Sequence, residues 1–409
     1  MKGVSGVTGG EGGATARRHD MTFELGINYW PRRRAMYMWI EHDLAEVRDE
    51  MAHIADLGFD VVRLFLLTRD FLPGPRTVDA AMVGRLVDVC RVASDAGLRV
   101  VPTLVVLNMS GRVWWPDWMR DARGEPRDLY ADPVLRAQEL LAESCARALA
   151  GSGAIRAFDL SNEIDDAQRP RTREAGAGWA LRLATAIRRH APGVPIQIGA
   201  HLPSLSAANN MRVDDLAAVA DEDVMHAYPL YSDVARGFLD PELVPFSCVL
   251  TSELAGSGRP TLMQELGLCT APPGMAGTTI TDDFLGAPRA QYLASEEEGA
   301  RYYEEVLERL VRTDAAGAYA WCYADYDPRL FDRPPLASAI RERTFGLVRA
   351  DGTEKPAAEL FRALRARRDA GTLGTAQPVA RLLDVSADEY YRDPAHHFAR
   401  LYARWTARA

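Results

Sequence analysis

Eight short apolar segments alternate along the chain with longer amphipathic segments, and this alternation constrains the fold more than any other feature of the sequence. Each apolar segment has the length of a buried strand, whereas the segments between them place apolar residues three and four positions apart, as helices do. Strands that alternate with helices favour parallel pairing within one sheet. The eight predicted strands are residues 23–29, 60–66, 99–107, 155–161, 195–200, 223–227, 260–265 and 317–323.

The helices and glycines between these strands support a closed barrel. The predicted helices are residues 43–57, 80–96, 133–150, 174–190 and 296–313. Gly58, Gly97 and Gly317 stand just before the next strand, where a left-handed glycine often ends a helix. Eight units can close a barrel, whereas an open doubly wound sheet usually has fewer strands and a glycine-rich phosphate loop. Residues 26–31 read Gly-Ile-Asn-Tyr-Trp-Pro and contain no such loop. The predicted fold is α/β, a single (β/α)8 TIM barrel.

The barrel is expected to occupy residues 21–368, between two segments of different character. Residues 1–20 are rich in Gly, Ser and Thr and are predicted to be a flexible leader. Residues 369–409 are predicted to be a helical C-terminal tail that packs on the barrel. Two long connections, residues 265–295 and 323–354, follow strands seven and eight. They would overhang the barrel face where such enzymes keep their active sites, so they are candidate lids or subsite walls.

Composition excludes several classes of partner. The chain has 409 residues, of which 26% are charged, and its formal net charge of −9 argues against nucleic acid or an anionic membrane as the partner. A small neutral ligand fits better, and a homo-oligomer is left open. Residues 1–20 lack the apolar stretch of a secretory signal, and no apolar run of about 18 residues occurs. A cytoplasmic location is therefore predicted, or secretion if a signal has been removed.

The five cysteines are odd in number and scattered, and none forms a CxxC pair. This pattern indicates reduced thiols rather than a disulfide framework or a zinc site. Asp residues flank the Glu163 motif, but paired histidines at metal-ligand spacing are lacking, so no metal and no cofactor is predicted.

Two glutamates stand where predicted strands four and seven end. The chain reads Phe-Asp-Leu-Ser-Asn-Glu at 158–163 and Thr-Leu-Met-Gln-Glu at 261–265. Strands four and seven lie nearly opposite each other in an eight-stranded barrel, so Glu163 and Glu265 would face each other across its mouth. Retaining glycoside hydrolysis needs two carboxyl groups about 5–5.5 Å apart, one that protonates the leaving oxygen and one that attacks the anomeric carbon. The alternative for either residue alone is a helix cap or an ion-pair partner.

The two carboxyl groups must differ in protonation. Arg63 on strand two is predicted to lie near Glu265 and hold it ionised, and the resulting anion would raise the pKa of Glu163 and keep it protonated. Tyr228 is a candidate hydrogen-bond donor to Glu265, and Asn162 a candidate donor to the 2-hydroxyl of the sugar.

Several of these motifs occur together in a known group of enzymes. Their order on the predicted strands resembles the retaining barrel glycosidases of clan A, most closely glycoside hydrolase family 5, over about residues 23–364. The resemblance implies that Glu163 is the acid/base and Glu265 the nucleophile. It also implies that the remaining residues shape the subsite of the cleaved sugar. These residues are Arg63, Asn162, His226, Tyr228 and Trp321.

One position departs from the family pattern. Many members carry a histidine near the end of strand three, whereas residues 105–109 here read Val-Val-Leu-Asn-Met. Asn108 is the candidate substitute for that histidine in the substrate subsite.

Aromatic residues cluster after strands one and three. Sugar rings present apolar faces that stack on such side chains, so Trp30, Trp114 and Trp115 are predicted to contact substrate. Packing of the barrel top or a protein interface are the alternatives for the second cluster, which also includes Trp118.

The resulting prediction is a glycosidase that cleaves β-glycosidic bonds by double displacement and binds a small carbohydrate. The β-linkage and the preference for β-mannosides are implied by the resemblance. The lengths of the two long loops favour a pocket and hence an exo-acting enzyme. The alternatives are a β-glucosidase or β-galactosidase, an endo-acting glycanase, a transglycosylase, a metal-dependent barrel hydrolase and a non-catalytic sugar-binding barrel.

Overall fold

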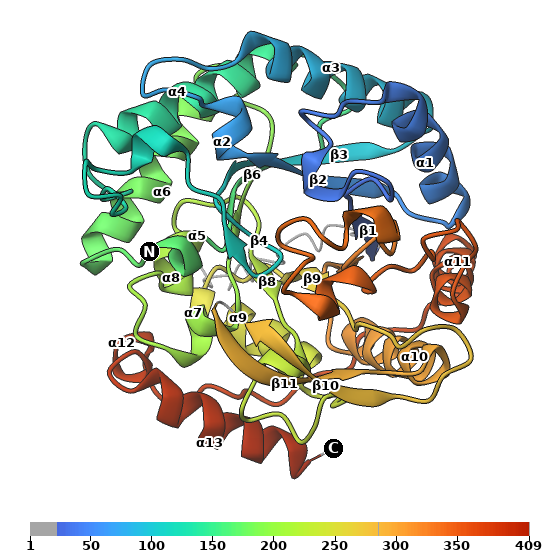
Figure 1. The fold of residues 1–409 in the computed structure, drawn as a ribbon. Helices are drawn as coiled ribbons and strands as arrows, with labels where there is room; N and C mark the ends of the chain where they lie inside the picture. Colours follow the sequence, from blue (N-terminus) through green and yellow to red (C-terminus); the bar gives the residue numbers. More distant parts are fainter. Residues whose placement is uncertain (1–22, 285, 409) are drawn as a thin grey trace, which may run out of the picture.

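The computed structural model describes residues 23–284 and 286–408. Eight parallel strands form one sheet in the order β7-β6-β3-β2-β1-β12-β9-β8. A parallel bridge between His201 and His226 joins the two outer strands, and the His226 N–H donates to Ala200 O at 2.8 Å. Helices surround the strands on the outside (Figure 1). The predicted (β/α)8 barrel is confirmed.

All eight predicted strands are present, with ends that differ by at most three residues from the predicted ones. Continuous apolar runs identified them because strands that are covered by helices outside and by packed side chains inside are buried on both faces. The strands are β1 (Glu24–Asn28), β2 (Val61–Leu67), β3 (Arg99–Val106), β6 (Phe158–Asn162), β7 (Ile196–Gly199), β8 (Val224–His226), β9 (Leu262–Leu266) and β12 (Gly317–Ala320).

The helices begin and end where the chain supplies caps. Asp79 accepts hydrogen bonds from two backbone N–H groups at the start of α3, and α10 begins with a capping box between Ser295 and Glu298. The outer helices are α1 (Leu44–Asp56), α3 (Ala80–Asp95), α4 (Val134–Leu149), α6 (Arg173–Arg188), α9 (Leu243–Ala255), α10 (Glu296–Arg312) and α11 (Pro356–Asp369). Shorter helices are α2 (Thr68–Phe71), α5 (Ile164–Ala167), α7 (Leu202–Ser206) and α8 (Val213–Ala217).

One of the three predicted glycine caps is wrong. Gly58 and Gly97 have positive φ angles of 94° and 81°, as a left-handed cap requires. Gly317 instead begins β12, and a Cβ at this position would lie 2.3 Å from Glu24 O. Close approach of β1 therefore explains this glycine, while Asp314 supplies the left-handed residue with a φ of 61°.

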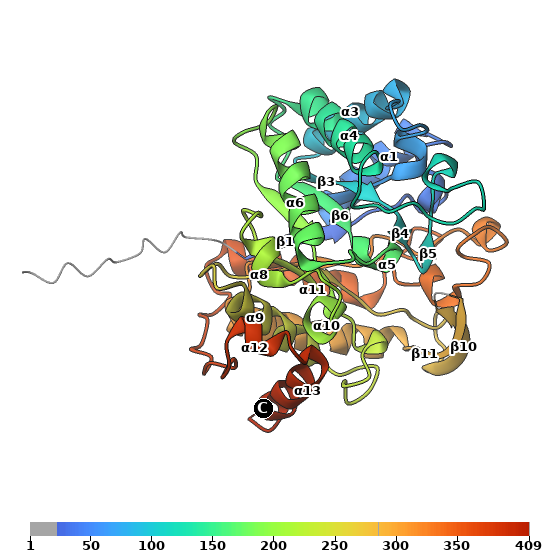
Figure 2. The same cartoon turned by 90° about the vertical axis from the view of Figure 1, so that its left-hand side faces the viewer.

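Three loops carry additional structure at the carboxyl end of the barrel. The loop after β3 holds the short strands β4 (Asn108–Met109) and β5 (Arg112–Val113). The loop after β9 forms a hairpin of β10 (Thr278–Phe284) and β11 (Ala287–Leu293), and the loop after β12 holds the 3-10 turns η4 (Pro328–Leu330) and η5 (Ile340–Arg343). Figure 2 shows β4, β5, β10 and β11 gathered at one end of the molecule.

The C-terminal residues pack against the barrel. Helix α13 (Pro394–Thr406) places Phe398 and Tyr402 against Phe246 of α9, with ring centroids 5.3 and 4.9 Å away. Tyr390 of α12 (Ala387–Tyr390) donates a hydrogen bond to Leu205 O of α7 at 2.7 Å. The predicted leader, residues 1–20, lies outside the described residues. The domain boundaries at residues 21 and 368 remain predictions.

Two further observations concern the whole described chain. All five cysteines are free and buried, in agreement with the predicted reduced thiols. Among the described residues, no helix combines the length and the apolar character needed to cross a membrane.

Candidate active site

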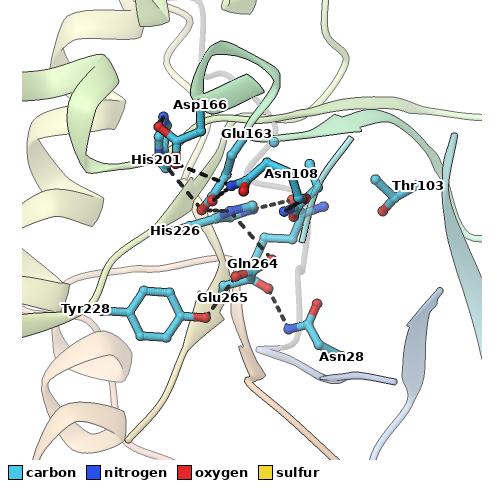
Figure 3. A network of polar contacts seen from close by, with 12 residues as sticks. Asn28, Thr103, Asn108, Glu163, Asp166, His201, His226, Tyr228, Gln264 and Glu265 are labelled. Carbon is cyan, nitrogen blue, oxygen red and sulfur yellow. Dashed lines mark hydrogen bonds and ion pairs between the residues drawn. The ribbon is translucent and has the colours of Figure 1, made fainter. Parts of the chain in front are cut away.

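A cavity of about 220 Å³ opens at the carboxyl end of the barrel. Both predicted carboxylates line it, Glu163 from the end of β6 and Glu265 from β9. One oxygen of Glu163 and one of Glu265 lie within 4.8 Å of each other. Figure 3 shows the two side chains pointing toward each other, with His226 between them.

The backbone at Glu163 aims its carboxylate into the cavity. Glu163 is the residue before α5 and has φ 45° and ψ 53°, a left-handed conformation that is uncommon outside glycine. Its side chain makes no capping hydrogen bond to α5. The helix-cap alternative therefore does not hold, and the strained backbone is typical of a functional site.

An irregular register places two consecutive β9 side chains inside the barrel. Met225 pairs with Met263, but His226 pairs with Glu265, so β9 contains one extra residue, Gln264. Such a bulge interrupts the usual alternation of side chains. Gln264 and Glu265 consequently both contact interior polar groups.

Arg63 of β2 connects the two strands that carry the carboxylates. Its guanidinium is fully buried and donates to Glu265 Oε1 at 2.5 Å, to Asp159 Oδ2 at 2.7 Å and to Asn162 Oδ1 at 3.0 Å. Arg63 lies beneath the cavity and does not line it. It therefore acts on substrate through Glu265. Asn28 receives a further hydrogen bond from Arg63 at 3.1 Å.

Tyr228 also holds Glu265. Its hydroxyl donates to Glu265 Oε2 at 2.8 Å, so each oxygen of this carboxylate has a donor. Burial raises the pKa of Tyr228 well above its ordinary value, and the nearby charge of Glu265 raises it further. The phenol thus stays protonated, and with Arg63 it donates hydrogen bonds to the Glu265 carboxylate.

A directed chain of hydrogen bonds leads from the interior of the barrel to His226. Gln197 Nε2 donates to the Glu222 carboxylate at 2.6 Å, so Gln197 Oε1 must accept from Gln264 Nε2 at 2.7 Å. Gln264 Oε1 then faces His226 Nε2 at 3.0 Å. Because an amide oxygen only accepts, His226 Nε2 carries a proton.

The other nitrogen of His226 contacts the candidate proton donor. His226 Nδ1 lies 2.9 Å from Glu163 Oε1 and 3.6 Å from Glu265 Oε1. A hydrogen bond of this length requires a proton between Nδ1 and Glu163, whether the carboxyl or the imidazole carries it. His226 Nδ1 and Glu163 therefore share one proton beside the gap between the two carboxylates.

His201 brings a second imidazole to Glu163. Its Nδ1 lies 3.8 Å from Glu163 Oε1, and its Nε2 lies 3.0 Å from Asp165 Oδ2. Burial lowers the pKa of His201, but Asp165, Asp166 and Glu163 outweigh burial and raise it well above its ordinary value. His201 is thus an imidazolium at neutral pH.

The protonation predicted for Glu163 from sequence is wrong for the unliganded protein. Burial raises the pKa of Glu163, but His201 and His226 outweigh burial, so the pKa lies below its ordinary value. Of the neighbours of Glu163, only the anion Glu265 was predictable from sequence, because the two imidazoles come from separate strand ends. The proton that Glu163 needs to act as an acid is therefore the one that it shares with His226.

The two predicted asparagines both line the cavity. Asn162 Nδ2 donates one hydrogen bond to Asn108 O at 3.2 Å, and its second N–H can serve the predicted sugar hydroxyl. Asn108 Nδ2 lies 3.3 Å from Asp166 and 3.4 Å from Glu163, and Asn108 Oδ1 is buried without a partner among the described residues. The structure thus places Asn108 beside Glu163 in the wall of the cavity.

The predicted aromatic contacts divide into two groups. Trp321 lines the cavity. Trp30 and Trp114 do not, because both rings are buried: Trp30 stacks on Phe65 at 5.5 Å, and Trp114 Nε1 donates to Met109 O at 3.2 Å. Their predicted role in stacking on sugar is wrong. Trp115 is half-buried against the core and is also outside the cavity lining.

Two triplets of side chains have ligand atoms close enough together to hold a metal ion. They are Glu163 with His226 and Glu265, and Glu163 with Asp166 and His201. In the first triplet, Glu265 is already neutralised by a buried guanidinium. In the second, the imidazolium form of His201 has no lone pair for a metal. Proton chemistry fits both sets better than metal binding.

Sequence reasoning missed several residues of the cavity wall. His201 follows β7 just as His226 ends β8, so a search for polar residues at strand ends would have found His201, whereas His226 was predicted only from the family resemblance. The other missed residues lie within loops whose conformation no periodic pattern predicts. They are Ser110, Tyr231, Arg341 and Glu342.

Comparison with known proteins supports the fold strongly. GH5_18 from Streptomyces cattleya, crystallised as a variant with Manβ1-4GlcNAc, has 22% sequence identity and a TM-score of 0.76 over 93% of this chain and 92% of its own. GH5_18 from Bifidobacterium longum, also with Manβ1-4GlcNAc, has 17% identity and a TM-score of 0.72 over 87% and 80% of the two chains. The chain has the fold of the glycoside hydrolase family 5 structures. The resemblance predicted from sequence is confirmed at this level.

An exo-β-1,4-mannosidase from Opitutaceae bacterium strain TAV5 has 25% identity and a TM-score of 0.72 over 86% of this chain. The match spans 61% of the Opitutaceae protein's own length. No protein-family model matches the chain, and no curated protein sequence matches it.

Proposed function

We propose that this protein is a retaining β-glycosidase that removes a single sugar, with β-mannosides as its preferred substrates. The observation that carries this proposal is the separation of Glu163 and Glu265, whose nearest oxygens lie within 4.8 Å. Retaining enzymes place the two carboxyl groups about 5–5.5 Å apart, whereas inverting enzymes leave about 6.5–9.5 Å for a water molecule.

In the first step, a Glu265 oxygen attacks the anomeric carbon while the bond to the leaving oxygen breaks. The proton on the contact between Glu163 and His226 passes through Glu163 to that oxygen. In the second step, Glu163 takes a proton from water, the resulting hydroxide attacks the anomeric carbon, and the Glu265 carboxylate leaves. Arg63 and Tyr228 stabilise the Glu265 carboxylate before it attacks and after it leaves.

The preference for β-mannosides and for exo action rests on similarity and on the shape of the site. Two of the similar structures hold Manβ1-4GlcNAc, and a third is an exo-β-1,4-mannosidase. Residues of the β4–β5 loop and of η5 line the cavity, and walls of this kind favour a pocket that takes one terminal sugar. β-Glucosides and β-galactosides remain alternative substrates on the same scaffold.

The test is a panel of aryl β-glycosides, with the anomer of the first product followed by NMR. We expect 4-nitrophenyl β-mannoside to be the best substrate and the β-anomer to appear first. Glu163→Gln and Glu265→Gln should each lose at least about 100-fold in kcat, since acid catalysis alone contributes about 10²–10⁴-fold. First appearance of the α-anomer would show inversion and would refute the proposed mechanism.

Two controls separate chemistry from folding and from metal dependence. Glu50→Gln changes a buried carboxylate remote from the cavity, where it accepts a hydrogen bond from Tyr29 at 2.7 Å, and should leave kcat nearly unchanged. A fluorinated slow substrate should label Glu265, and a label on another residue would overturn the nucleophile assignment. Loss of activity on treatment with a chelator would favour the metal-dependent alternative.

A further inference from the structure

The turn η5 brings a second pair of charged side chains to the cavity, and the proposed chemistry does not use them. Arg341 and Glu342 both line the cavity, although they are only 1% and 5% exposed. Their charged groups lie 3.4 Å apart. Ionised groups are costly to bury unless they are paired and hydrogen-bonded, so such a pair at a cavity wall needs an explanation.

The hairpin β10–β11 fixes this pair in place. Asp282 of β10 accepts hydrogen bonds from the backbone N–H groups of residues 340 and 341, at 2.6 and 3.1 Å, and from the Arg341 guanidinium at 2.8 Å. On the opposite side, a Cβ on Gly111 would lie 2.8 Å from Arg341 Nη2. Two loops thus hold Arg341, and Arg341 in turn fixes its neighbour Glu342.

Contacts along one wall place Glu342 on the same side as the nucleophile. Tyr228 holds Glu265, and its ring lies 5.4 Å from that of Tyr231. The Tyr231 hydroxyl donates to Glu342 Oε1 at 3.2 Å. Asp166 and His201 line the cavity on the side of Glu163, and the β4–β5 loop connects the two sides, with Asn108 against Glu163 and Gly111 against Arg341.

This division of the walls orients the substrate. In the proposed mechanism the proton donor contacts the oxygen between the sugar and its leaving group, so the leaving group lies toward the wall of Glu163. The cleaved sugar then lies toward the wall of Glu265. Its end farthest from the cleaved bond points toward Glu342.

The charges of the cluster indicate what this wall binds. Arg341 carries one positive charge, whereas Asp282 and Glu342 each supply a carboxylate, and the guanidinium already donates to Asp282 and to Tyr231 at 3.0 Å. The positive charge of Arg341 is thus already matched by Asp282, although burial raises the pKa of Glu342, and the Glu342 carboxyl group is left to accept hydrogen bonds from neutral hydroxyl groups. A sugar that carries its own carboxylate would be repelled.

We propose that Glu342, positioned by Arg341 and by Asp282 of the β10–β11 hairpin, binds the free hydroxyl groups at the non-reducing end of the cleaved sugar. Its ligand is a neutral, unsubstituted terminal hexose. This inference rests on the proposed glycosidase function and adds the residue that limits it to such sugars.

The test compares 4-nitrophenyl β-mannoside with its 3-, 4- and 6-deoxy analogues on the wild type and on Glu342→Gln. If the wild type prefers another β-hexoside, the same three positions are compared on that sugar. A hydrogen bond to a charged group is worth a factor of about 10–150. We expect the wild type to lose that factor in kcat/KM for at least one deoxy analogue, and Glu342→Gln to lose less than about threefold for the same analogue.

Each loss is a ratio measured within one variant, so the folded fraction of the variant cancels. Gly111→Ala crowds Arg341 Nη2, strains the loop at a φ of 73° and leaves every carboxylate intact, and it should also reduce the loss for that analogue. Glu359→Gln changes a carboxylate on α11 that is 73% exposed, and it should behave like the wild type. Equal losses for all deoxy analogues in wild type and Glu342→Gln would overturn the inference.

A uronide gives an independent readout. The wild type should hydrolyse 4-nitrophenyl β-glucuronide at least about 100-fold more slowly than the preferred hexoside, and Glu342→Gln should narrow that difference. Faster hydrolysis of the glucuronide by the wild type would mean that Arg341 binds a carboxylate, which contradicts the inference. Failure of the wild type on every glycoside would instead refute the proposed function itself.

Discussion

The directed hydrogen bonds that end at His226 predict a specific defect in Gln264→Met. Methionine fills a similar volume but cannot accept the proton on His226 Nε2 or donate to Gln197. Each buried group left without a partner costs about 1–3 kcal/mol. The two groups together cost about 2–6 kcal/mol against a typical stability of about 5–15 kcal/mol, and urea unfolding measures the stability that is left.

The catalytic effect concerns the proton that His226 Nδ1 and Glu163 share. Without Gln264, a proton on His226 Nε2 has no acceptor, whereas a proton on Nδ1 still donates to Glu163 Oε1 at 2.9 Å. The proton between Nδ1 and Glu163 then stays on the imidazole, and passing it to the leaving oxygen costs about 1–3 kcal/mol more, which corresponds to a fall of roughly 5- to 150-fold in steps that need the acid.

Substrates with different leaving groups separate this effect from general damage. A 2,4-dinitrophenolate leaves as a stable anion without a proton, whereas a phenolate needs acid assistance. For Gln264→Met, kcat/KM on the phenyl glycoside should fall by the predicted factor, and kcat/KM on the dinitrophenyl glycoside should change less than about threefold. Equal falls on both substrates would refute the proton argument.

A matched control comes from another buried glutamine. Gln138 accepts from Trp179 Nε1 at 2.8 Å and donates to Leu129 O at 2.8 Å, between α4 and α6 and outside the cavity lining. Gln138→Met makes the same chemical change and should lose comparable stability in urea unfolding. Its ratio of activities on the two glycosides should equal that of the wild type.

Three further predictions concern other contacts. His201→Asn removes a cation beside the proton donor and should shift the basic limb of the pH profile of kcat/KM to higher pH. Asp166→Asn removes a carboxylate whose pKa is raised to about 6, chiefly by burial, and should shift that limb to lower pH. Equal shifts in one direction would contradict this electrostatic argument. Asp325→Asn leaves the buried ammonium of Lys355 without its charged partner at 2.7 Å and should cost about 3–5 kcal/mol in urea unfolding. The added Lys355→Met should restore part of that loss. Trp114→Phe should lower Tm but change KM less than about twofold, and a tenfold rise in KM would restore its predicted role in sugar binding.

The strands were predictable from sequence because barrel strands are buried on both faces and appear as continuous apolar runs. The candidate carboxylates were predictable for a related reason. A glutamate such as Glu163 or Glu265 interrupts an apolar run at its carboxyl end, and in a barrel all such ends meet at one face. Knowing the strand order was therefore enough to bring the two residues together.

The wall of the cavity and the protonation of its residues could not be predicted in the same way. Arg341 and Glu342 reach the cavity through a turn that depends on Asp282, nearly 60 residues earlier in the chain. The pKa of Glu163 depends on two imidazoles that arrive from β7 and β8. In both cases the decisive quantity is a distance between loops or strand ends, and local sequence patterns do not specify such distances.

The buried polar side chains inside the barrel control both the orientation and the protonation of the catalytic groups. Arg63, Asp159, Gln197 and Gln264 are fully buried, and each is hydrogen-bonded to other interior groups. An apolar interior of the same volume would be at least as stable, because buried charges rarely add net stability. These residues therefore serve to orient the catalytic groups, and their hydrogen bonds fix which atom carries each proton. Replacing one of them should alter the pH profile and the dependence on leaving group more than it alters the fold.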